Sequence, residues 1–361
     1  MEKTNQNKYS IFLINNKQLK LLIFIANIFI NEIIKIKYKK VGIIGLPHSQ
    51  NIGNNLLKYA MYIKLTELGF KPYIIGQRYG NDNISFILNN VKVILINKSF
   101  NEINRNDYDI LMVNSDQTWR KDSEHFFYDI GFLNFSKNWE IPKFVYGASL
   151  GFDYWDYTKK EEDTIKSLLK NFKGISVREK GSVKLIDTHL GIKPIFVLDP
   201  TLLINKKYYL NIIKNFKIDK IFDNNFIFVY TLTNSKELNI FIKNITEKYN
   251  NKIYIIDVNV ANQIEKFIYG IYKSKAVITD SFHGAIFSII FNKPFISFVY
   301  EERGIERFNS LKEIFNLQDR IVSYNSSPDY NLLEKPLKIN KNLLNYLKKK
   351  SIRFLKSNLF F

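Results

Sequence analysis

The sequence predicts an α/β protein made of two doubly wound halves that face a central cleft. Short apolar, β-branched runs alternate with segments of helical length, which is typical of strand–helix–strand units in parallel sheets. Polar residues repeatedly follow those runs directly, at the sheet edge where open α/β sheets bind ligands. A stretch rich in Lys, Asn and Tyr over 205–225 separates two such series.

The first series begins with a predicted strand at Val41–Gly45 and a polar loop at Pro47–Asn55. A helix is predicted from about Leu56 to Leu68, because its apolar residues recur at helical spacing and Gly69 is a typical C-terminal stop. The strand Tyr73–Ile75 follows. Further strands are predicted at 91–96, 109–113, 143–146, 174–177 and 195–198, with helices at 158–171 and from about 181 to 190.

The second series begins at the strand Phe226–Tyr230. Its remaining elements are a helix at 236–249, a strand at 252–256, a helix at 264–273, a strand at 276–279, a helix at 285–291, a strand at 295–299 and a basic terminal helix at 340–355. We therefore expect domains at 41–204 and 226–361, joined by a linker at 205–225, with the terminal helix in the second domain.

Residues 1–40 form an apolar and basic extension, in which Leu21–Ile30 is strongly apolar. A membrane-spanning helix needs about 20 apolar residues, and Asn27, Asn31 and Glu32 interrupt this stretch. No secretory cleavage pattern follows it. We expect a helix packed on the domain surface, and an interfacial membrane helix is the alternative.

The chain carries 53 Lys+Arg against 34 Asp+Glu, a net charge of +19. This charge suits an anionic partner: a phosphorylated small molecule, an acidic membrane or nucleic acid. Zinc-finger spacing, RNA-binding aromatic motifs and basic zippers are absent, so we expect no nucleic-acid partner. Because the chain has no Cys, it forms no disulfide and no thiolate metal site, in agreement with a reducing cytoplasm.

His283 is the leading catalytic candidate. It lies where the strand 276–279 gives way to a helix, in the segment Asp280-Ser281-Phe282-His283-Gly284. The first N–H groups of a helix and the positive end of its dipole favour bound anions. A histidine there can hold a phosphate and exchange a proton near neutral pH. The competing interpretation is a helix-capping or half-buried structural histidine.

Six short motifs occur in order over about 41–299, and together they resemble the polysaccharide pyruvyl transferase family. They are Asn51-Ile52-Gly53-Asn54, Asn114-Ser115-Asp116-Gln117-Thr118-Trp119, Tyr146-Gly147-Ala148-Ser149-Leu150-Gly151, Ile175-Ser176-Val177-Arg178-Glu179-Lys180, Asp199-Pro200-Thr201-Leu202-Leu203, and Thr279–Gly284 with Asn292-Lys293-Pro294. The chain departs from the family pattern at Asn114, at Thr118 and in a longer first loop that carries Pro47 and His48.

The resemblance implies two Rossmann-like domains of the GT-B type. It also implies transfer of pyruvate from phosphoenolpyruvate onto a sugar of a surface glycan, or its precursor, as a ketal. No metal and no cofactor beyond the donor substrate are expected. The implied catalytic residues are His283, which binds donor phosphate and acts as general acid, Arg178, which grips a carboxylate or phosphate, and Asp116, which accepts a proton. For Arg178 the alternative is a surface ion pair with Glu179 or a nearby Asp. Asp280 is a second candidate base, or the N-cap of its helix.

We expect the donor and acceptor to be held by a wider set of polar and glycine residues at the same sheet edges. This set comprises Asn51, Gly53, Asn54, Ser115, Gln117, Ser149, Lys180, Ser281, Gly284 and Arg303. Arg307 is a further candidate for closing the anion site.

Two other functions fit the same sequence. A GT-B-type glycosyltransferase would use a nucleotide sugar in place of phosphoenolpyruvate. A non-catalytic, membrane-associated component of glycan assembly would use the apolar N-terminus and the basic surface, and would bind no donor. In each case the expected acceptor or partner is a saccharide or lipid-linked saccharide, and the expected location is the cytoplasm, including the inner face of the cell membrane.

Overall fold

The computed structural model describes residues 21, 39–47, 51–77, 85–96, 99–121, 127–216, 226–233, 235–249, 252–256, 263–326 and 328–360. The predicted helix at Leu21–Ile30 and His48 therefore lie outside the described residues, apart from Leu21. None of the described helices combines the length and the apolar character needed to cross a bilayer.

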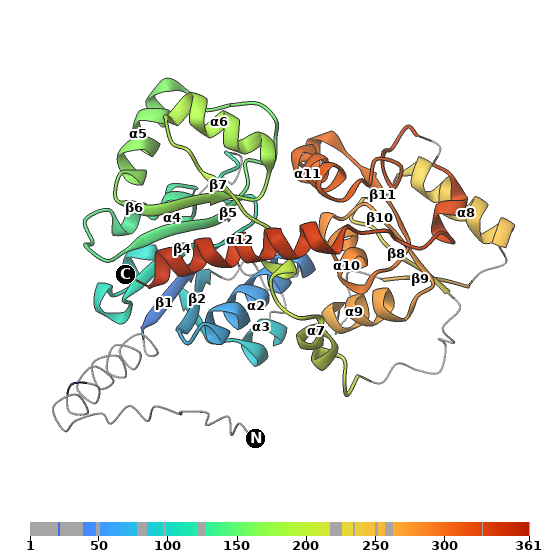
Figure 1. Ribbon diagram of the computed structural model, residues 1–361, viewed down its shortest axis with the longest axis horizontal. Coiled ribbons are helices and arrows are strands. Elements are labelled where there is room, and N and C mark those ends of the chain that lie inside the picture. The colour runs from blue at the N-terminus through green and yellow to red at the C-terminus, as the bar shows by residue number, and fades with distance from the viewer. Residues whose placement is uncertain are drawn as a thin grey trace, which may run out of the picture.

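Two parallel sheets form the body of the protein, one in each half of Figure 1. The first sheet has the order β3-β2-β1-β4-β5-β6-β7. Its strands are β1 (Lys40–Ile44), β2 (Lys71–Gln77), β3 (Val93–Ile96), β4 (Ile110–Val113), β5 (Lys143–Ala148), β6 (Phe172–Val177) and β7 (Ile195–Phe196). The helices around it are α2 (Ile52–Glu67), α3 (Ser85–Asn90), α4 (Phe127–Phe132), α5 (Lys159–Leu169) and α6 (Lys180–Leu190). We call this sheet with its helices the first half.

The second sheet has the order β12-β11-β10-β8-β9. Its strands are β8 (Phe226–Tyr230), β9 (Lys252–Ile255), β10 (Ala276–Thr279), β11 (Phe295–Val299) and β12 (Ile321–Ser323). The helices of this second half are α8 (Lys236–Tyr249), α9 (Gln263–Lys273), α10 (Phe282–Phe291) and α11 (Ile305–Phe315). The predicted fold, two doubly wound Rossmann-like domains of the GT-B type, is confirmed.

The strands of the first sheet bury both of their faces, and one of the two resulting apolar clusters extends into the second half. Alternate residues of β1 and β4 point to opposite sides of the first sheet: Val41 and Met112 join one cluster, and Ile44 and Val113 another. The first of these clusters also contains residues of α9, α10 and the second sheet. Apolar packing therefore joins the two halves, through the short helix α7 (Lys206–Ile212) and the 3-10 turn η4 (Pro200–Leu202).

Helix α12 (Lys341–Leu359) packs on the first half, whereas we expected the terminal helix to belong with the second domain. Figure 1 shows it running from the second half back over the first sheet. Phe354 lies against Phe144 and Tyr146 of β5, at centroid distances of 6.4 and 6.2 Å. The helix has an apolar stripe, and the first sheet offers the complementary apolar face.

Helix α2 begins four residues earlier than the apolar spacing predicts. Asn51 is its N-cap, and the Asn51 side chain accepts a hydrogen bond from the Asn54 backbone N–H at 2.9 Å. Gly53 and Asn54 are therefore in the first helical turn and do not belong to a loop. Helix α11 was not predicted, although its apolar residues Ile305, Phe308 and Leu311 recur at helical spacing.

Candidate functional site

The strand order reverses once in each sheet, and the candidate site lies at both reversal points. In the first sheet the reversal falls between β1 and β4, and in the second between β8 and β10. Ligands of open α/β sheets bind outside the carboxyl ends of the strands at such a point. A cavity of about 190 Å³ opens there. Its wall is formed by Leu46, Asn51, Asp116, Gln117, Arg120, Leu232, Asp280, Ser281, Phe282, Tyr300, Arg303, Arg307 and Phe308.

Three arginines line this cavity. The Arg303 guanidinium donates to Thr233 Oγ1 at 3.0 Å and lies 3.6 Å from Asp280 Oδ2. Arg120 donates to the Glu302 carbonyl at 3.3 Å and stacks over the Phe152 ring. Arg307 donates to backbone carbonyls of Arg303 and Gly304, and forms no salt bridge with a described carboxylate.

Arg307 therefore faces the cavity with its positive charge outside any salt bridge to a described carboxylate. Burial, and then the neighbouring Arg178, lower the pKa of Arg307 to about 10. Its guanidinium still carries a full charge at neutral pH. The cavity wall can therefore hold an anion.

Asp116 is the carboxylate that the first half contributes to the cavity. Its backbone has a φ of +111°, a conformation that costs free energy for a residue with a side chain. Burial acts to raise its pKa, but the neighbouring charges, Arg178 foremost and Arg307 with it, outweigh burial and lower the pKa below its usual value. Asp116 is therefore ionised at neutral pH.

Arg178 is buried behind this wall and is already held by two carboxylates. Its terminal nitrogens donate to Asp199 Oδ2 at 2.8 Å and to Asp116 Oδ1 at 2.9 Å. Only 4% of Arg178 is exposed. The leading sequence interpretation gave this guanidinium to a ligand, and the alternative was an ion pair at the surface; the structure shows ion pairs, but buried ones. In the structure it orients Asp116.

His283 is the second residue of α10 and is buried, at 6% exposure. Its ring packs on Gly53, where an added Cβ would collide with the imidazole. His283 Nε2 has no hydrogen-bond partner among the described residues and lies 3.8 Å from Asp199 Oδ2. Burial lowers the pKa of His283 to about 4, although Asp199 and Asp116 act to raise it. The free protein therefore holds a neutral imidazole one layer behind the cavity wall.

Asp280 does not cap α10. Ser281 is the N-cap, and its hydroxyl accepts from the Gly284 N–H at 3.4 Å. The Asp280 carboxylate instead accepts from the backbone N–H groups of Leu232 and Thr233, at 2.6 and 2.9 Å, and from the Tyr324 hydroxyl. It thereby ties the chain after β8 to the chain after β10.

Seven of the predicted site residues line the cavity: Asn51, Asp116, Gln117, Asp280, Ser281, Arg303 and Arg307. The others lie outside its wall. Ser115 donates to the Gly147 carbonyl at 2.8 Å and Ser149 is fully buried. Asn54 donates to the Pro47 carbonyl, and Gly284 packs on Thr279.

Sequence reasoning missed Arg120, Phe282 and Tyr300, and it missed the helix that carries Arg307 and Phe308. The apolar period of α11 is the signal that would have found this helix and, with it, Phe308; Arg307 was already a candidate because it follows the last strand. Lys58 of α2 is a further missed residue near Asp116. Burial lowers the pKa of Lys58 to about 7, and its ammonium donates to the Pro47 carbonyl at 3.3 Å.

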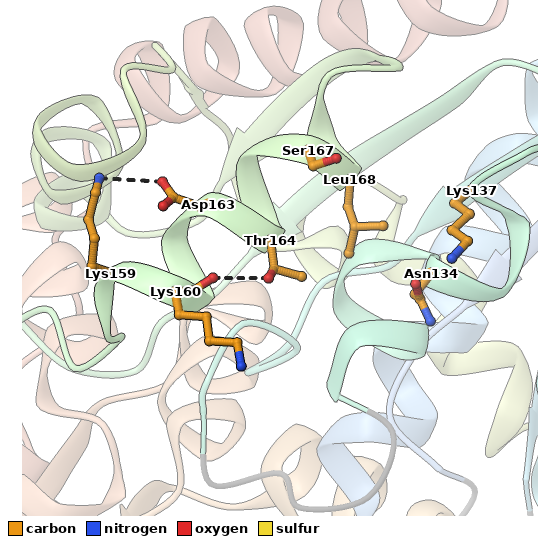
Figure 2. Close-up of a pocket in the computed structure, with 8 residues that line it drawn as sticks. All are labelled: Asn134, Lys137, Lys159, Lys160, Asp163, Thr164, Ser167 and Leu168. Atoms are coloured by element: carbon orange, nitrogen blue, oxygen red, sulfur yellow. Dashed lines mark hydrogen bonds and ion pairs between the residues drawn. The ribbon is translucent and has the colours of Figure 1, made fainter.

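A second, more open groove of about 700 Å³ lies beside α5, as Figure 2 shows. Lys137, Lys159 and Lys160 line it, and Lys159 pairs with Asp163 and Glu162. None of the predicted site residues lies there. Among the described residues, no group of three or more His, Asp or Glu side chains is arranged to hold a metal ion.

Comparison with solved structures shows what this fold is similar to. UDP-GlcNAc 2-epimerase from Methanocaldococcus jannaschii has a TM-score of 0.53 at 14% identity, covering 88% of this chain and 99% of that chain. A putative UDP-N-acetylglucosamine 2-epimerase from Listeria monocytogenes has a TM-score of 0.50 at 12% identity, covering 89% and 96%. The S. aureus MnaA–UDP structure has a TM-score of 0.50 at 15% identity, covering 89% and 97%. At such low identity these similarities establish the GT-B-type fold alone.

Comparison with curated proteins finds no matching sequence. The family profile of polysaccharide pyruvyl transferase matches residues 51–302, which include every residue of the cavity wall except Leu46, Arg303, Arg307 and Phe308. The chain therefore belongs to the polysaccharide pyruvyl transferase family, a family of transferases.

Proposed function

We propose that this protein transfers pyruvate from phosphoenolpyruvate to a sugar of a surface glycan, or of its precursor, and forms a ketal. The observation that carries the proposal is the cavity at the two reversal points, which three arginines line. Family membership supplies the reaction class.

The charge of the cavity fits the donor. Phosphoenolpyruvate has a carboxylate and a phosphate, and carries nearly three negative charges at neutral pH. Arg303 and Arg307 lie on the same wall as Ser281, the N-cap of α10. We place the phosphate at the start of α10, where the helix dipole favours an anion, and the carboxylate against an arginine fork.

The reaction needs one proton donor and one acceptor for hydroxyl protons. Protonation of C3 makes an oxocarbenium-like C2, which one sugar hydroxyl attacks. The bond from C2 to the phosphate oxygen breaks, and a second hydroxyl closes the ketal. Of the two hydroxyl protons released, one balances the proton gained at C3 and the other leaves with phosphate. The site must therefore stabilise the departing phosphate and hold the acceptor hydroxyls.

We assign the C3 proton to His283. In the free protein its imidazole is neutral at pH 7, since burial lowers its pKa to about 4. A phosphate bound at the start of α10 adds negative charge beside the ring and raises that pKa. Binding of the donor therefore favours protonation of the His283 imidazole. The ring must turn from its place between Gly53 and Asp199 to reach the cavity.

Asp116 is suited to hold an acceptor hydroxyl. It lines the cavity and stays ionised, because Arg178 fixes one carboxylate oxygen. A carboxylate with a lowered pKa is a weak base, so its main contribution is to orient the hydroxyl. Arg178 thus supports the reaction as a positioning residue.

Thermal stability with added ligand tests the donor. A ligand that binds only the native state raises the melting temperature by mass action. We expect phosphoenolpyruvate to raise it, and Arg307→Gln to abolish most of the shift, while the remote and exposed Arg105→Gln retains it. A shift with nucleotide sugars and none with phosphoenolpyruvate would overturn the proposal in favour of glycosyl transfer.

A further inference from the structure

The first turn of α6 is capped by the opposite half of the molecule. Glu179 occupies the N-cap position of this helix, but its side chain makes no capping hydrogen bond. The first N–H groups of any helix need acceptors from outside the helix. Helix α11, which belongs to the second half, supplies them.

Two hydrogen bonds make this contact. The Lys180 backbone N–H donates to Ser310 Oγ at 3.0 Å, and the Gly181 N–H donates to Glu306 Oε1 at 3.0 Å. A carboxylate at the positive end of a helix dipole is electrostatically favourable. Glu306 and Ser310 are 8% and 3% exposed, so water competes poorly for either bond.

The glycine at 181 makes the close approach feasible. A Cβ at this position would lie 2.5 Å from Glu306 Oε1 and 2.8 Å from its Cδ. Any larger residue would therefore push the carboxylate away from the helix. Because Gly181 has no side chain, the first half leaves room for the Glu306 carboxylate.

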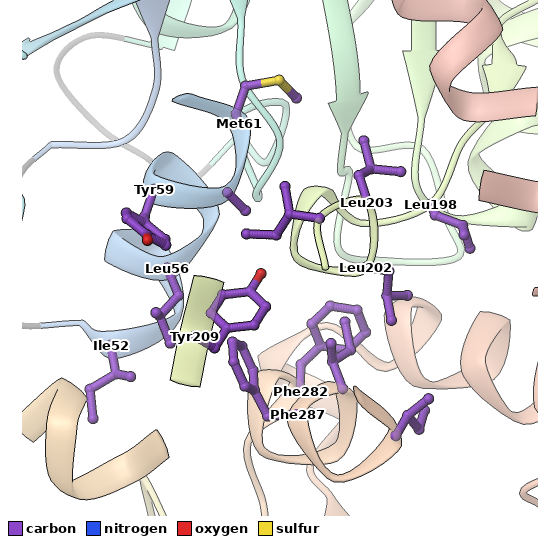
Figure 3. Close-up of a cluster of buried hydrophobic side chains, with 14 of the residues drawn as sticks. Ile52, Leu56, Tyr59, Met61, Leu198, Leu202, Leu203, Tyr209, Phe282 and Phe287 are labelled. Carbon is purple, nitrogen blue, oxygen red and sulfur yellow. The ribbon is translucent and has the colours of Figure 1, made fainter. Parts of the chain in front are cut away.

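Helix α11, which makes this contact with α6, also carries residues of the cavity wall. Arg307 and Phe308 of α11 line the cavity, and Arg303 lies two residues before the helix. Away from the arginines, apolar contacts through α7 join the two halves. Figure 3 shows one of them, between Tyr209 of α7 and Phe287 of α10, whose rings are 4.8 Å apart. If the halves parted, water would hydrogen-bond the polar groups that became exposed, whereas it would not compensate for the lost apolar contacts. The arginine side is thus the side at which the halves can part.

We propose that Glu306 and Ser310 are positioning residues: they clasp α11 to the start of α6 and thereby hold Arg303 and Arg307 around the donor cavity. The identity of the donor rests on the proposed function. The clasp itself rests only on the contacts between α6 and α11.

Hydrogen exchange and donor kinetics test the clasp together. We expect Glu306→Ala and Ser310→Ala to speed exchange of the Lys180 and Gly181 amides about tenfold. In the same variants KM for phosphoenolpyruvate should rise about tenfold while kcat changes less, since the arginines act on binding.

Three further variants give the test its controls. Glu306→Gln keeps an acceptor oxygen and should restore most of the amide protection. Gly181→Ala blocks the clasp from the α6 side and should raise KM as Glu306→Ala does. Glu313→Ala removes only the exposed ion pair with the Lys180 ammonium, at 3.1 Å, and should change neither readout.

Unchanged exchange in Glu306→Ala would overturn the clasp. Faster exchange with an unchanged KM would overturn the positioning of the arginines. A wild-type protein that does not turn over phosphoenolpyruvate would contradict the proposed function alone, and the exchange of the two amides would still decide whether the clasp exists.

Discussion

Replacing Arg178 tests whether the buried network behind the cavity holds Asp116 in place. The guanidinium makes two charge-assisted hydrogen bonds, at 2.8 and 2.9 Å, to carboxylates whose side chains are 3% and 12% exposed. A lysine ammonium is a single point and cannot span both partners as the planar fork does. Arg178→Lys thus loses about one such bond, or about 1.5–3 kcal/mol of unfolding free energy. Arg178→Met leaves three buried carboxylates, those of Asp116, Asp199 and Glu179, without their cation and should cost about 3–5 kcal/mol.

Tryptophan fluorescence during urea unfolding measures this directly. The three tryptophans, Trp119, Trp139 and Trp155, all lie in the first half, together with Arg178. The control is Arg105→Lys at an exposed position, for which we expect a change within about 0.5 kcal/mol. If both variants matched wild type, the network would contribute no net stability. If the Met variant were as stable as the Lys variant, the carboxylates would not need a buried cation, and our account of Asp116 would be wrong.

Three other predictions follow from named contacts. Gly53→Ala should destabilise the protein by about 1–3 kcal/mol, because the new Cβ collides with the His283 ring; Gly45→Ala, whose Cβ would meet only Asn114 at 3.6 Å, should be tolerated in the same urea assay. Because the pKa of His283 is about 4 in the folded protein and about 6.5 in the unfolded chain, the unfolded chain takes up the proton at higher pH. The free energy of unfolding should therefore fall as pH drops from about 6.5 towards 4. At pH 5 wild type should therefore have lost about 2 kcal/mol more than His283→Gln relative to pH 7, and parallel losses in the two proteins would contradict the lowered pKa. Phe354→Ala should cost about 3–5 kcal/mol by opening a cavity against Phe144 and Tyr146, whereas Tyr346→Ala on the exposed face of α12 should cost little; equal urea midpoints for the two variants would show that α12 does not stabilise the first half.

The sequence predicted the bounds of individual helices and strands more accurately than the contacts that these elements make with one another. The strands Phe226–Tyr230 and Phe295–Val299 and the helix Lys236–Tyr249 have the predicted bounds. Each is a strongly patterned run between polar or turn-forming residues, so local physics settles it. Helix α2 was predicted too short, because a side-chain cap at Asn51 extends it into a stretch with no apolar period.

The site shows the same division. The sequence makes Asp116 and His283 candidates because polar residues after parallel strands meet at one sheet edge. The structure places Asp116 in the cavity wall and His283 outside it. Their protonation states and hydrogen-bond partners could not be predicted from the sequence. Arg178 is held by Asp116 and Asp199, which follow different strands, and the His283 ring is neutral because of what buries it.

Local patterns in the sequence are enough to predict the α/β class, the two halves and the sheet edge at which the candidate site lies. These follow from periodicity and from the fixed geometry of parallel strands. Long-range packing sets the remaining features: α12 returns to the first sheet, α11 caps α6, and Arg307 faces the cavity without a salt bridge to a described carboxylate. Such contacts join residues more than a hundred positions apart, and they depend on shape and burial that no local pattern encodes.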